Sequence, residues 1–533
     1  MVAAFYLLHM QPQDRIAINT GYLYARMAIT VFISLYATRL VLGALGANDF
    51  GIFNLVGGAI AMLTFLNTSM AAATQRFMSF ALGARNSDRQ KSIFNVSIIL
   101  HFMIAILVVL ALEGVGAFLF NGILKIEPDK IEVAKWIFQF MLIDTFFTIV
   151  SVPYDAIINA NENMLLVTIL GILESVLKLA IAIYITKTPY GKLMTYGLLT
   201  ASLSVLLLII RRVYCHVVYE EAVINFNKFY DKSLLKEMTS FAGWNLLGSS
   251  TSMVASYGQG IVMNVFFGTI ANAAQGIAAQ ISGQLGAFST TMMLALNPVI
   301  DKSEGAGNRS LMIKASVVGS KVSFFLLMFF YVPFLIETPF ILKLWLKNVP
   351  AFVVIFCRLL LLRNLIEQLF ITLTSSISAV GNIKRFQIFS SILFILPLLV
   401  TYYLYYLHYP VYTLYVIFLL FAVVKSVNIL YFSFLSFNLS FKFFLERVIF
   451  RCLSAFGLIF ILTFIPFFIL NTGFVRLSVV CITNVVSFFI VVLFVGFTNN
   501  ERIEFITIFK QLINKMQLNK RRAYQAITKT NGR

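Results

Sequence analysis

Apolar stretches long enough to cross a membrane fill nearly the whole chain. A transmembrane helix needs about 20 mainly apolar residues to span the hydrocarbon core. Fourteen segments reach or approach that length, at residues 16–42, 50–80, 92–120, 133–157, 164–186, 191–214, 241–267, 275–300, 316–341, 351–378, 386–408, 411–437, 447–470 and 474–497. Because 60% of the residues are apolar and only 12% are charged, the chain is predicted to be an all-α polytopic membrane protein with about 14 transmembrane helices.

Positive charge gathers in every second loop between these segments. The loops around Asn48, Asn272 and Tyr409 carry no Lys or Arg, whereas basic residues cluster at 85–91, 228–236, 302–314 and 384–385. Basic loops stay on the cytoplasmic side of membrane proteins, so we expect both termini to be cytoplasmic, in a multi-pass protein of the bacterial inner membrane. The net charge of +19 fits this topology and contact with anionic lipid, and no nucleic-acid partner is predicted.

The first twelve segments form two halves that resemble each other. Gly83-Ala84-Arg85-Asn86 closes the second segment, and Gly305-Ala306-Gly307-Asn308 closes the eighth. Six spans return each half to the same side, so the halves should be parallel repeats around an axis along the membrane normal. We therefore predict a first lobe at 1–214, a cytoplasmic linker at 215–240, a second lobe at 241–437, two extra spans at 438–500 and a cytoplasmic tail at 501–533.

The tail beyond residue 500 combines apolar residues at helical spacing with many basic residues. This pattern predicts an amphipathic helix that lies on anionic lipid. A solvated tail is the alternative.

Three arginines lie within the first two segments, where a charged side chain is costly unless it faces a polar interior or the interface. On an ideal helix, Asn19, Tyr22 and Arg26 share one face, which makes Arg26 the predicted anchor for an anionic group. A structural ion pair with Asp144 is the alternative for Arg26. Arg76 is a candidate for the inner mouth of a cavity, whereas the motif around Arg39 is expected to be architectural.

Polar residues of the second half complete the set of candidates for a central cavity. Gln259 ends a stripe of serines, for which close helix packing through small residues is the favoured explanation. Gln280 and Gln284 lie one helical turn apart. The cationic candidates are Arg358 and Lys425, which have no acidic residue at helical spacing, and Arg363, which Glu367 can neutralise four residues later.

Acidic residues within the spans leave the question of ion coupling open. Glu113, Asp144 and Asp155 are candidates for binding a proton or a sodium ion, although pairing with nearby arginines is the favoured explanation. The four cysteines and four histidines are scattered, so neither a metal site nor a cofactor is predicted.

Three short motifs resemble the multidrug/oligosaccharidyl-lipid/polysaccharide (MOP) exporter superfamily, which includes the MATE transporters, and within it the bacterial Wzx-type polysaccharide flippases. They are RLVLGALGANDFG at 39–51, TQRFMSFALG at 74–83 and PYDAIINANENM at 153–164. The resemblance implies a MATE-like fold and the transfer of undecaprenyl-pyrophosphate-linked oligosaccharide to the outer leaflet for O-antigen or capsule biosynthesis. It also leaves room for contact with a polysaccharide polymerase and other assembly proteins.

Other functions remain open at this point. A drug or metabolite exporter of the same superfamily, coupled to sodium or protons, is the main alternative, although it would favour a more acidic pocket. A lipid II flippase is not separated from the Wzx type by sequence. An enzyme of the same pathway, a polymerase or ligase, is disfavoured because the predicted outer loops are short, so no catalytic residues are predicted.

Overall fold

The computed structural model describes residues 12–61, 64–118, 120, 130–189, 191–346, 349, 351–503 and 507, and these contain helices but no strand. The α-helices are α2 (Pro12–Ala61), α3 (Thr64–Gly83), α4 (Ser87–Phe118), α5 (Ile131–Ala160), α6 (Met164–Lys187), α7 (Lys192–Val218), α8 (Phe226–Phe229), α9 (Lys232–Gly305), α10 (Arg309–Leu346), α11 (Val353–Gln368), α12 (Ile371–Val380), α13 (Lys384–Tyr406), α14 (Thr413–Phe437), α15 (Phe441–Phe444), α16 (Phe450–Ile469) and α17 (Phe474–Val491). Two π-helical turns, η3 (Leu445–Ile449) and η4 (Val492–Gly496), adjoin α16 and α17.

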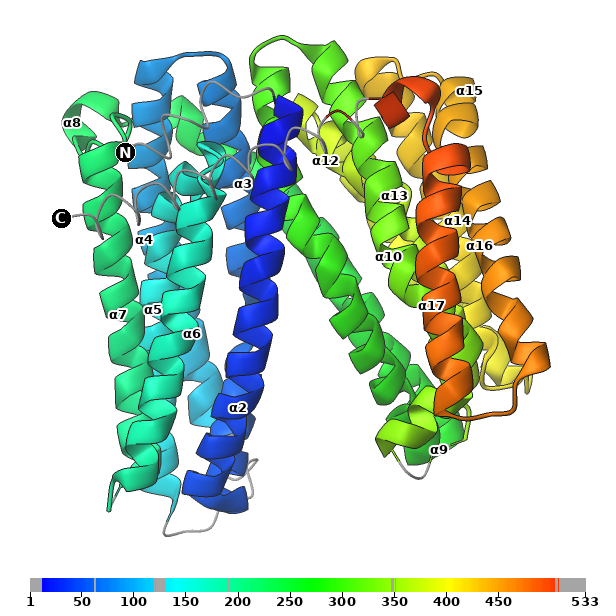
Figure 1. Ribbon diagram of the computed structural model, residues 1–533. Helices are drawn as coiled ribbons and strands as arrows, with labels where there is room; N and C mark the ends of the chain where they lie inside the picture. Colours follow the sequence, from blue (N-terminus) through cyan, green and yellow to red (C-terminus); the bar gives the residue numbers. More distant parts are fainter. Residues whose placement is uncertain are drawn as a thin grey trace, which may run out of the picture.

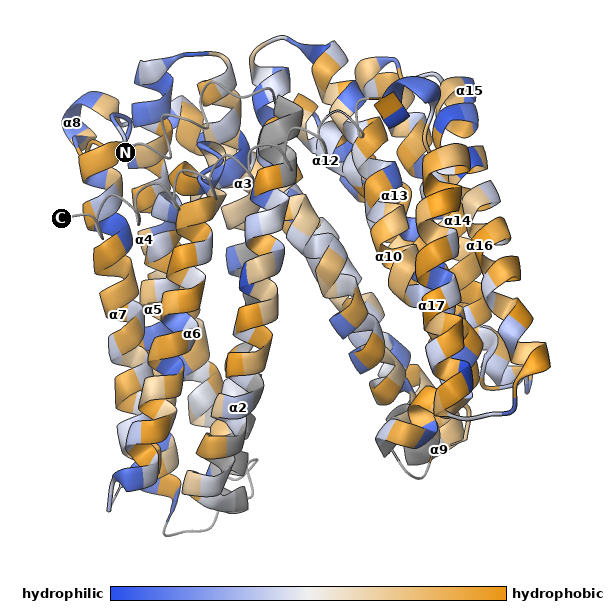
Figure 2. Ribbon diagram, in the orientation of Figure 1, coloured by the Kyte–Doolittle hydropathy of each residue, from blue (hydrophilic) through white to orange (hydrophobic). Residues whose placement is uncertain are grey.

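These helices confirm the predicted all-α membrane fold. Ten helices of the described chain are long and apolar enough to cross a membrane. The remaining predicted spans fall in the second part of α2 with α3, in α9, and in α11 with α12. Figure 2 shows that α9 is less hydrophobic than α16 and α17. Since α9 also lines a large cavity of the second lobe, its lower hydropathy reflects the polar surface that it turns away from lipid.

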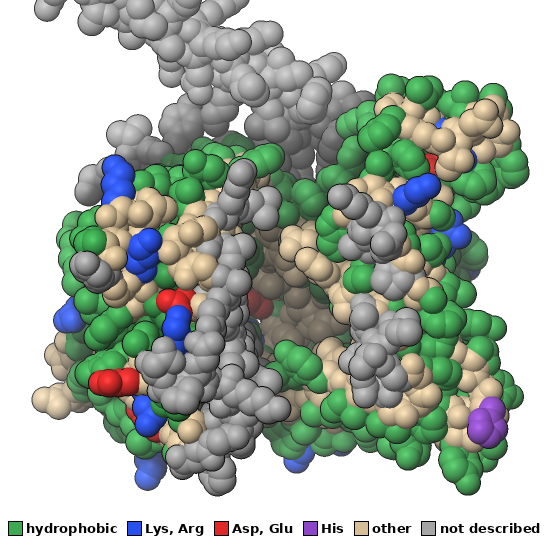
Figure 3. Space-filling model, turned by 90° about the horizontal axis from the view of Figure 1, so that it is seen from below, with side chains coloured by type: hydrophobic (Ala, Val, Ile, Leu, Met, Phe, Trp, Pro, Cys, Tyr) green, Lys and Arg blue, Asp and Glu red, His purple; other side chains and the backbone are tan. Residues whose placement is uncertain are grey.

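The helices form two lobes that meet at one end and diverge toward the other (Figure 1). Helices α2 to α7 build the first lobe, and α9 to α14 with α16 and α17 build the second. We call the end where the lobes meet, which carries α8 and α15, the closed end, and the other the open end. Seen from the open end, the space-filling surface is hollowed between the lobes (Figure 3).

Contacts between the lobes are concentrated toward the closed end. The Tyr24 hydroxyl of α2 donates to the Phe288 carbonyl of α9 at 2.7 Å. Ser69 of α3 donates to Ser249 of α9 at 3.2 Å. Helix α3 also packs along α9, so these two helices lie at the junction of the lobes.

Helices α16 and α17 pack against α10 on the second lobe. The Arg476 guanidinium in α17 binds the Glu337 carboxylate of α10 through two hydrogen bonds of 2.7 and 2.8 Å. Near the other end of α10, Lys321 pairs with Glu501 at 2.8 Å. Two ion pairs therefore join the C-terminal helical segment to α10. The predicted amphipathic tail lies largely outside the described residues, which beyond residue 500 are 501–503 and 507.

Candidate substrate-binding site

A large cavity lies in the second lobe, with a volume of about 1110 Å³. Residues of α9 to α14 form its wall. Gly248, Gly283 and Gly286 of α9 keep this wall free of bulky side chains. Hydroxyl and amide groups dominate the polar lining, namely Asn245, Ser249, Ser252, Ser256, Ser289, Thr290, Asn364, Gln368, Thr374, Gln387, Ser390 and Ser426. Tyr257, which also lines the cavity, is 62% exposed.

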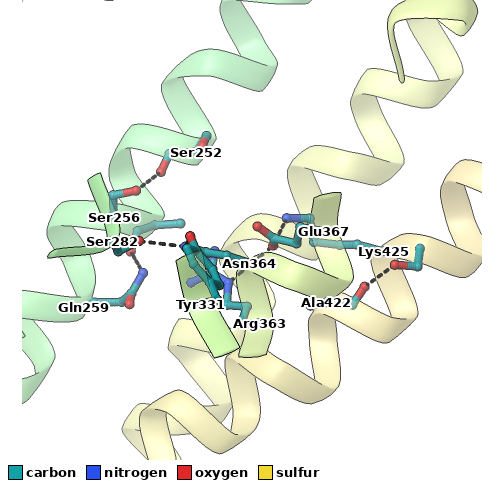
Figure 4. A network of polar contacts seen from close by, with 12 residues as sticks. Ser252, Ser256, Gln259, Ser282, Tyr331, Arg363, Asn364, Glu367, Ala422 and Lys425 are labelled. Carbon is teal, nitrogen blue, oxygen red and sulfur yellow. Dashed lines mark hydrogen bonds and ion pairs between the residues drawn. The ribbon is translucent and has the colours of Figure 1, made fainter. Parts of the chain in front are cut away.

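Three charged residues meet at this cavity. Lys425 of α14 lies 2.8 Å from the Glu367 carboxylate of α11, and Arg363 lies 3.3 Å from the same oxygen. Aromatic rings support both cations, since the Lys425 ammonium lies 4.1 Å from the centre of Phe394 and the Arg363 guanidinium 5.1 Å from that of Phe418. Two cations share one carboxylate, so this cluster carries a net positive charge. Figure 4 shows the two cations directed toward Glu367.

A network of neutral polar groups extends from this charged cluster. The Asn364 amide donates to Ser282 at 2.7 Å and to the Tyr331 hydroxyl at 3.3 Å (Figure 4). The Gln368 amide donates to Ser289, which is itself hydrogen bonded to Ser323. These contacts hold the amide planes in place, and a cavity with ordered amides and hydroxyls suits a ligand rich in hydroxyl groups.

Only part of the second-lobe set predicted from sequence reaches this cavity. Lys425 lines it, and Arg363 joins it through Glu367. Gln259 is buried and donates to the Ala255 carbonyl of its own helix at 3.1 Å. Gln280 and Gln284 line a separate apolar groove of about 250 Å³ between α9 and α10.

Arg358 is held by backbone carbonyls rather than by the cavity. Its Nε donates to the Leu335 carbonyl at 3.0 Å, and a second nitrogen donates to the Ile336 carbonyl at 3.4 Å. In a regular helix the Leu335 carbonyl would accept from residue 339, but Pro339 has no N–H. Arg358 therefore replaces the hydrogen bond that this proline removes.

Arg26 lies against α6 in the first lobe. A Cβ placed on Gly171 would lie 2.1 Å from the Arg26 Nε, so the guanidinium occupies the space that this glycine leaves. Arg26 is half-buried and, within the described part of the chain, has no ion-pair or hydrogen-bond partner. On the same helix, Asn19 is buried and donates to the Glu162 carbonyl at 3.1 Å, whereas Tyr22 is half-buried.

Arg76 connects the lobes at the closed end. It is 9% exposed and donates from α3 to the Ala379 carbonyl of α12 at 2.8 Å. The rings of Phe77 and Phe241 lie 4.9 and 4.8 Å from its guanidinium carbon. Arg76 is thus enclosed in this conformation. The side chain of Arg39 lies outside the described residues.

The three acidic candidates lie in different surroundings. Asp144 lines a first-lobe cavity of about 480 Å³ and accepts a hydrogen bond from Ser204. Asp155 forms an ion pair with Arg211 at 2.8 Å, whereas Glu113 is exposed on α4. The structure therefore does not bring these carboxylates together, and no group of three metal-binding side chains occurs among the described residues.

Sequence reasoning did not select Glu367 as a site residue, although this carboxylate joins both cations. The four-residue spacing of Arg363 and Glu367 was visible, but Lys425 follows 58 residues later on another helix. It also missed the pairing of Glu162 with Lys302, at 2.6 Å, because these residues lie in different lobes. The sequence did carry one signal for Glu162, because this residue lies within the PYDAIINANENM motif at 153–164.

Comparisons with known proteins identify the fold. Residues 25–184 match the MatE family model. No curated protein matches the chain by sequence. Similar solved structures include an outward-facing multidrug resistance MATE family transporter of the MOP superfamily, with 17% identity and a TM-score of 0.66. Another is a MATE in a bent conformation, also with 17% identity and a TM-score of 0.66.

A third similar structure is a MOP superfamily transporter from Pyrococcus furiosus, whose reversed binding-pocket polarity was taken to suggest a different function. It is 17% identical, with a TM-score of 0.64. Each of the three matches covers 80% of this chain and 96% of the other. The protein is thus a multi-pass integral membrane protein with the fold of the MATE transporters of the MOP superfamily.

Proposed function

We propose that this protein is a flippase that moves undecaprenyl-pyrophosphate-linked oligosaccharide to the outer leaflet for surface polysaccharide synthesis. The observation that carries the proposal is the second-lobe cavity, which is large, rich in hydroxyls and amides, and net positive at the cluster of Glu367, Arg363 and Lys425. An oligosaccharide offers many hydroxyl groups to such a lining. No bond is made or broken in this reaction.

Arg26 supplies the anchor for the pyrophosphate in this proposal. A guanidinium donates paired, charge-assisted hydrogen bonds to phosphate oxygens. Arg26 is half-buried and its donors are not occupied by other described residues. The lipid tail would remain in the bilayer between the lobes while the lobes rock around the headgroup.

The proposed orientation places the closed end in the cytoplasm. The loops at this end include the basic residues Arg85, Lys228 and Lys384, and positive loops stay inside. The open end then faces outward. An inside-negative potential favours outward movement of an anionic headgroup by about 2.3 kcal/mol per charge per 100 mV, so ion coupling is not required.

Polysaccharide display in cells that depend on this chain tests the proposal. Arg26→Ala and Lys425→Gln should each lower display at least about tenfold at equal protein level, because a single charge-assisted contact to phosphate or a buried charge is worth this much. Lys187→Gln, which removes an exposed positive charge at the end of α6, is the matched control and should leave display unchanged. Normal display in both site variants would contradict the proposal.

One observation favours a second function, the export of a drug or metabolite coupled to a cation. The first-lobe cavity contains Asp144 together with Phe53 and Tyr196, a combination that suits an organic cation or a coupling ion. Lys178 also lines this cavity, and its charge is paired with Glu174 at 2.6 Å. Efflux of a fluorescent organic cation that is lost in Asp144→Asn, with polysaccharide display intact, would favour this function. Complementation of cells lacking a lipid II flippase tests the remaining close alternative.

A further inference from the structure

Two glycines let the lobes touch backbone to backbone at the closed end. A Cβ on Gly83 of α3 would lie 2.0 Å from the Lys302 carbonyl oxygen of α9. A Cβ on Gly305 of α9 would lie 2.0 Å from the Phe80 carbonyl oxygen of α3. The contact is reciprocal, and any larger residue at either position would force the helices apart.

An ion pair spans the lobes beside this crossing. Glu162, in the turn between α5 and α6, is 4% exposed, and its carboxylate lies 2.6 Å from the Lys302 ammonium. The turn is held in place because Asn19 donates to the Glu162 carbonyl at 3.1 Å. The Lys302 side chain remains 28% exposed, so water reaches one partner of the pair.

The position of Lys302 links these two features. Its carbonyl lies under Gly83, whereas its ammonium reaches Glu162, so one residue of α9 contacts both α3 and the α5–α6 turn. Separation of the lobes at the closed end would have to break both contacts. Separation at the open end leaves both intact, and this is the arrangement in Figure 1.

We propose that the Glu162–Lys302 ion pair and the Gly83–Gly305 crossing form a releasable latch that holds the closed end shut and stabilises the conformation open at the other end. The latch rests on the proposed transport cycle but not on the identity of the substrate. A partly exposed ion pair is weak enough to break in each cycle. The glycine crossing gives the closed position a tight fit, so that the latch re-forms in one geometry.

Distance measurement between spin labels tests the latch without substrate. Labels on Asp88→Cys and Ser310→Cys, both exposed at the closed end on opposite lobes, report its opening. Cys481, the exposed native cysteine, is replaced by serine, and the other three cysteines are buried. We expect Glu162→Gln or Lys302→Met to raise the ratio of long to short distances about fivefold.

A charge reversal and a matched ion pair make this result specific. The double variant Glu162→Lys with Lys302→Glu should restore the short distance. Glu304→Gln, which breaks the pair of Glu304 with Arg309 inside the second lobe, should leave the distances unchanged. Unchanged distances in both single latch variants would overturn the proposal.

Glycine variants test the crossing independently. Gly305→Ala should populate the long distance, because its Cβ collides with the Phe80 backbone. Gly276→Ala in the same helix has no atom within 4 Å of the new Cβ and should not. Because the readout is conformational, normal latch behaviour combined with absent polysaccharide export would reject the flippase proposal while leaving the latch standing.

Discussion

At the residue scale, the surroundings of each arginine decide what it can do. Arg358 satisfies two backbone carbonyls next to Pro339. Arg76 is enclosed between aromatic rings and bound to the Ala379 carbonyl. Arg26 is half-buried and keeps its donors available within the described chain. Arg358 and Arg76 each already donate to a backbone carbonyl and so gain less from an anionic ligand than Arg26, which is the strongest candidate of the three.

The space that Gly171 leaves for Arg26 gives a prediction. We expect Gly171→Ala to displace the guanidinium and to lower polysaccharide display, because its Cβ would lie 2.1 Å from the Arg26 Nε. The protein should not lose stability, since a long side chain can swing aside and alanine favours a helix by about 1 kcal/mol over glycine. Thermal unfolding and display, measured on the same preparation of cells, separate the two effects.

Gly21→Ala in α2 is the control for this prediction, because its Cβ would meet no atom within 4 Å. It should gain the same helix stability and keep full display. Full display in Gly171→Ala would show that the position of Arg26 against α6 is not needed for export.

Individual residues also show where sequence reasoning stops. Helical spacing predicted the stripe of Asn19, Tyr22 and Arg26 because these residues share one helix, and the rotation per residue of an α-helix is fixed. The pairing of Lys425 with Glu367 depends on how α14 packs against α11, which no spacing along the chain encodes. The buried position of Arg76 likewise depends on α12 of the other lobe.

At the scale of elements, the C-terminal segment that contains α16 and α17 packs against α10 of the second lobe. The ion pairs of Glu337 with Arg476 and of Lys321 with Glu501 join this segment to α10. These helices should therefore move with the second lobe.

The pair of Glu337 and Arg476 is buried, with side-chain exposures of 0% and 8%, and this gives a stability prediction. Glu337→Gln should lower the free energy of unfolding by about 3 kcal/mol, because it leaves a buried guanidinium without its counter-ion. Thermal unfolding in detergent measures the effect. Glu446→Gln, which removes the partner of an exposed pair with a 4.0 Å separation, should cost less than about 1 kcal/mol.

A double variant checks the cause of that loss. Glu337→Leu with Arg476→Met removes both charges, and its stability should return close to that of the original protein because no unpaired charge remains. If the double variant is as unstable as Glu337→Gln, packing rather than charge explains the loss.

Hydropathy predicted these elements, and the places where its signal is weakest are informative. The predicted spans that fall in the second part of α2 with α3, in α9 and in α11 with α12 are not among the ten helices of the described chain that are long and apolar enough to cross a membrane. Helix α9 carries serines and glycines on the cavity wall. A helix that faces a polar interior needs fewer apolar residues than one that faces lipid on most sides, so the weak hydropathy signal itself marked the cavity.

At the scale of the whole molecule, the two lobes meet at the end that carries the basic loops and separate at the other. The proposed orientation turns this geometry into a prediction about access from outside. Ser256 is exposed on the cavity wall, and Lys236 is exposed at the closed end. In the Cys481→Ser background, a membrane-impermeant maleimide should label Ser256→Cys in spheroplasts but not Lys236→Cys.

Permeabilising the membrane should make Lys236→Cys reactive, because the reagent then reaches the cytoplasmic face that the basic loops occupy. Labelling of Lys236→Cys in intact spheroplasts would instead invert the proposed orientation. The latch variant Glu162→Gln adds a further test, since a shift toward lobes that separate at the closed end must reduce access from the open end. When Glu162→Gln is added to the Ser256→Cys variant, the maleimide should label the introduced cysteine more slowly in spheroplasts. Adding Glu304→Gln instead should leave the labelling rate unchanged. The same labelling reaction thus tests the orientation, the latch and the alternating exposure of the cavity.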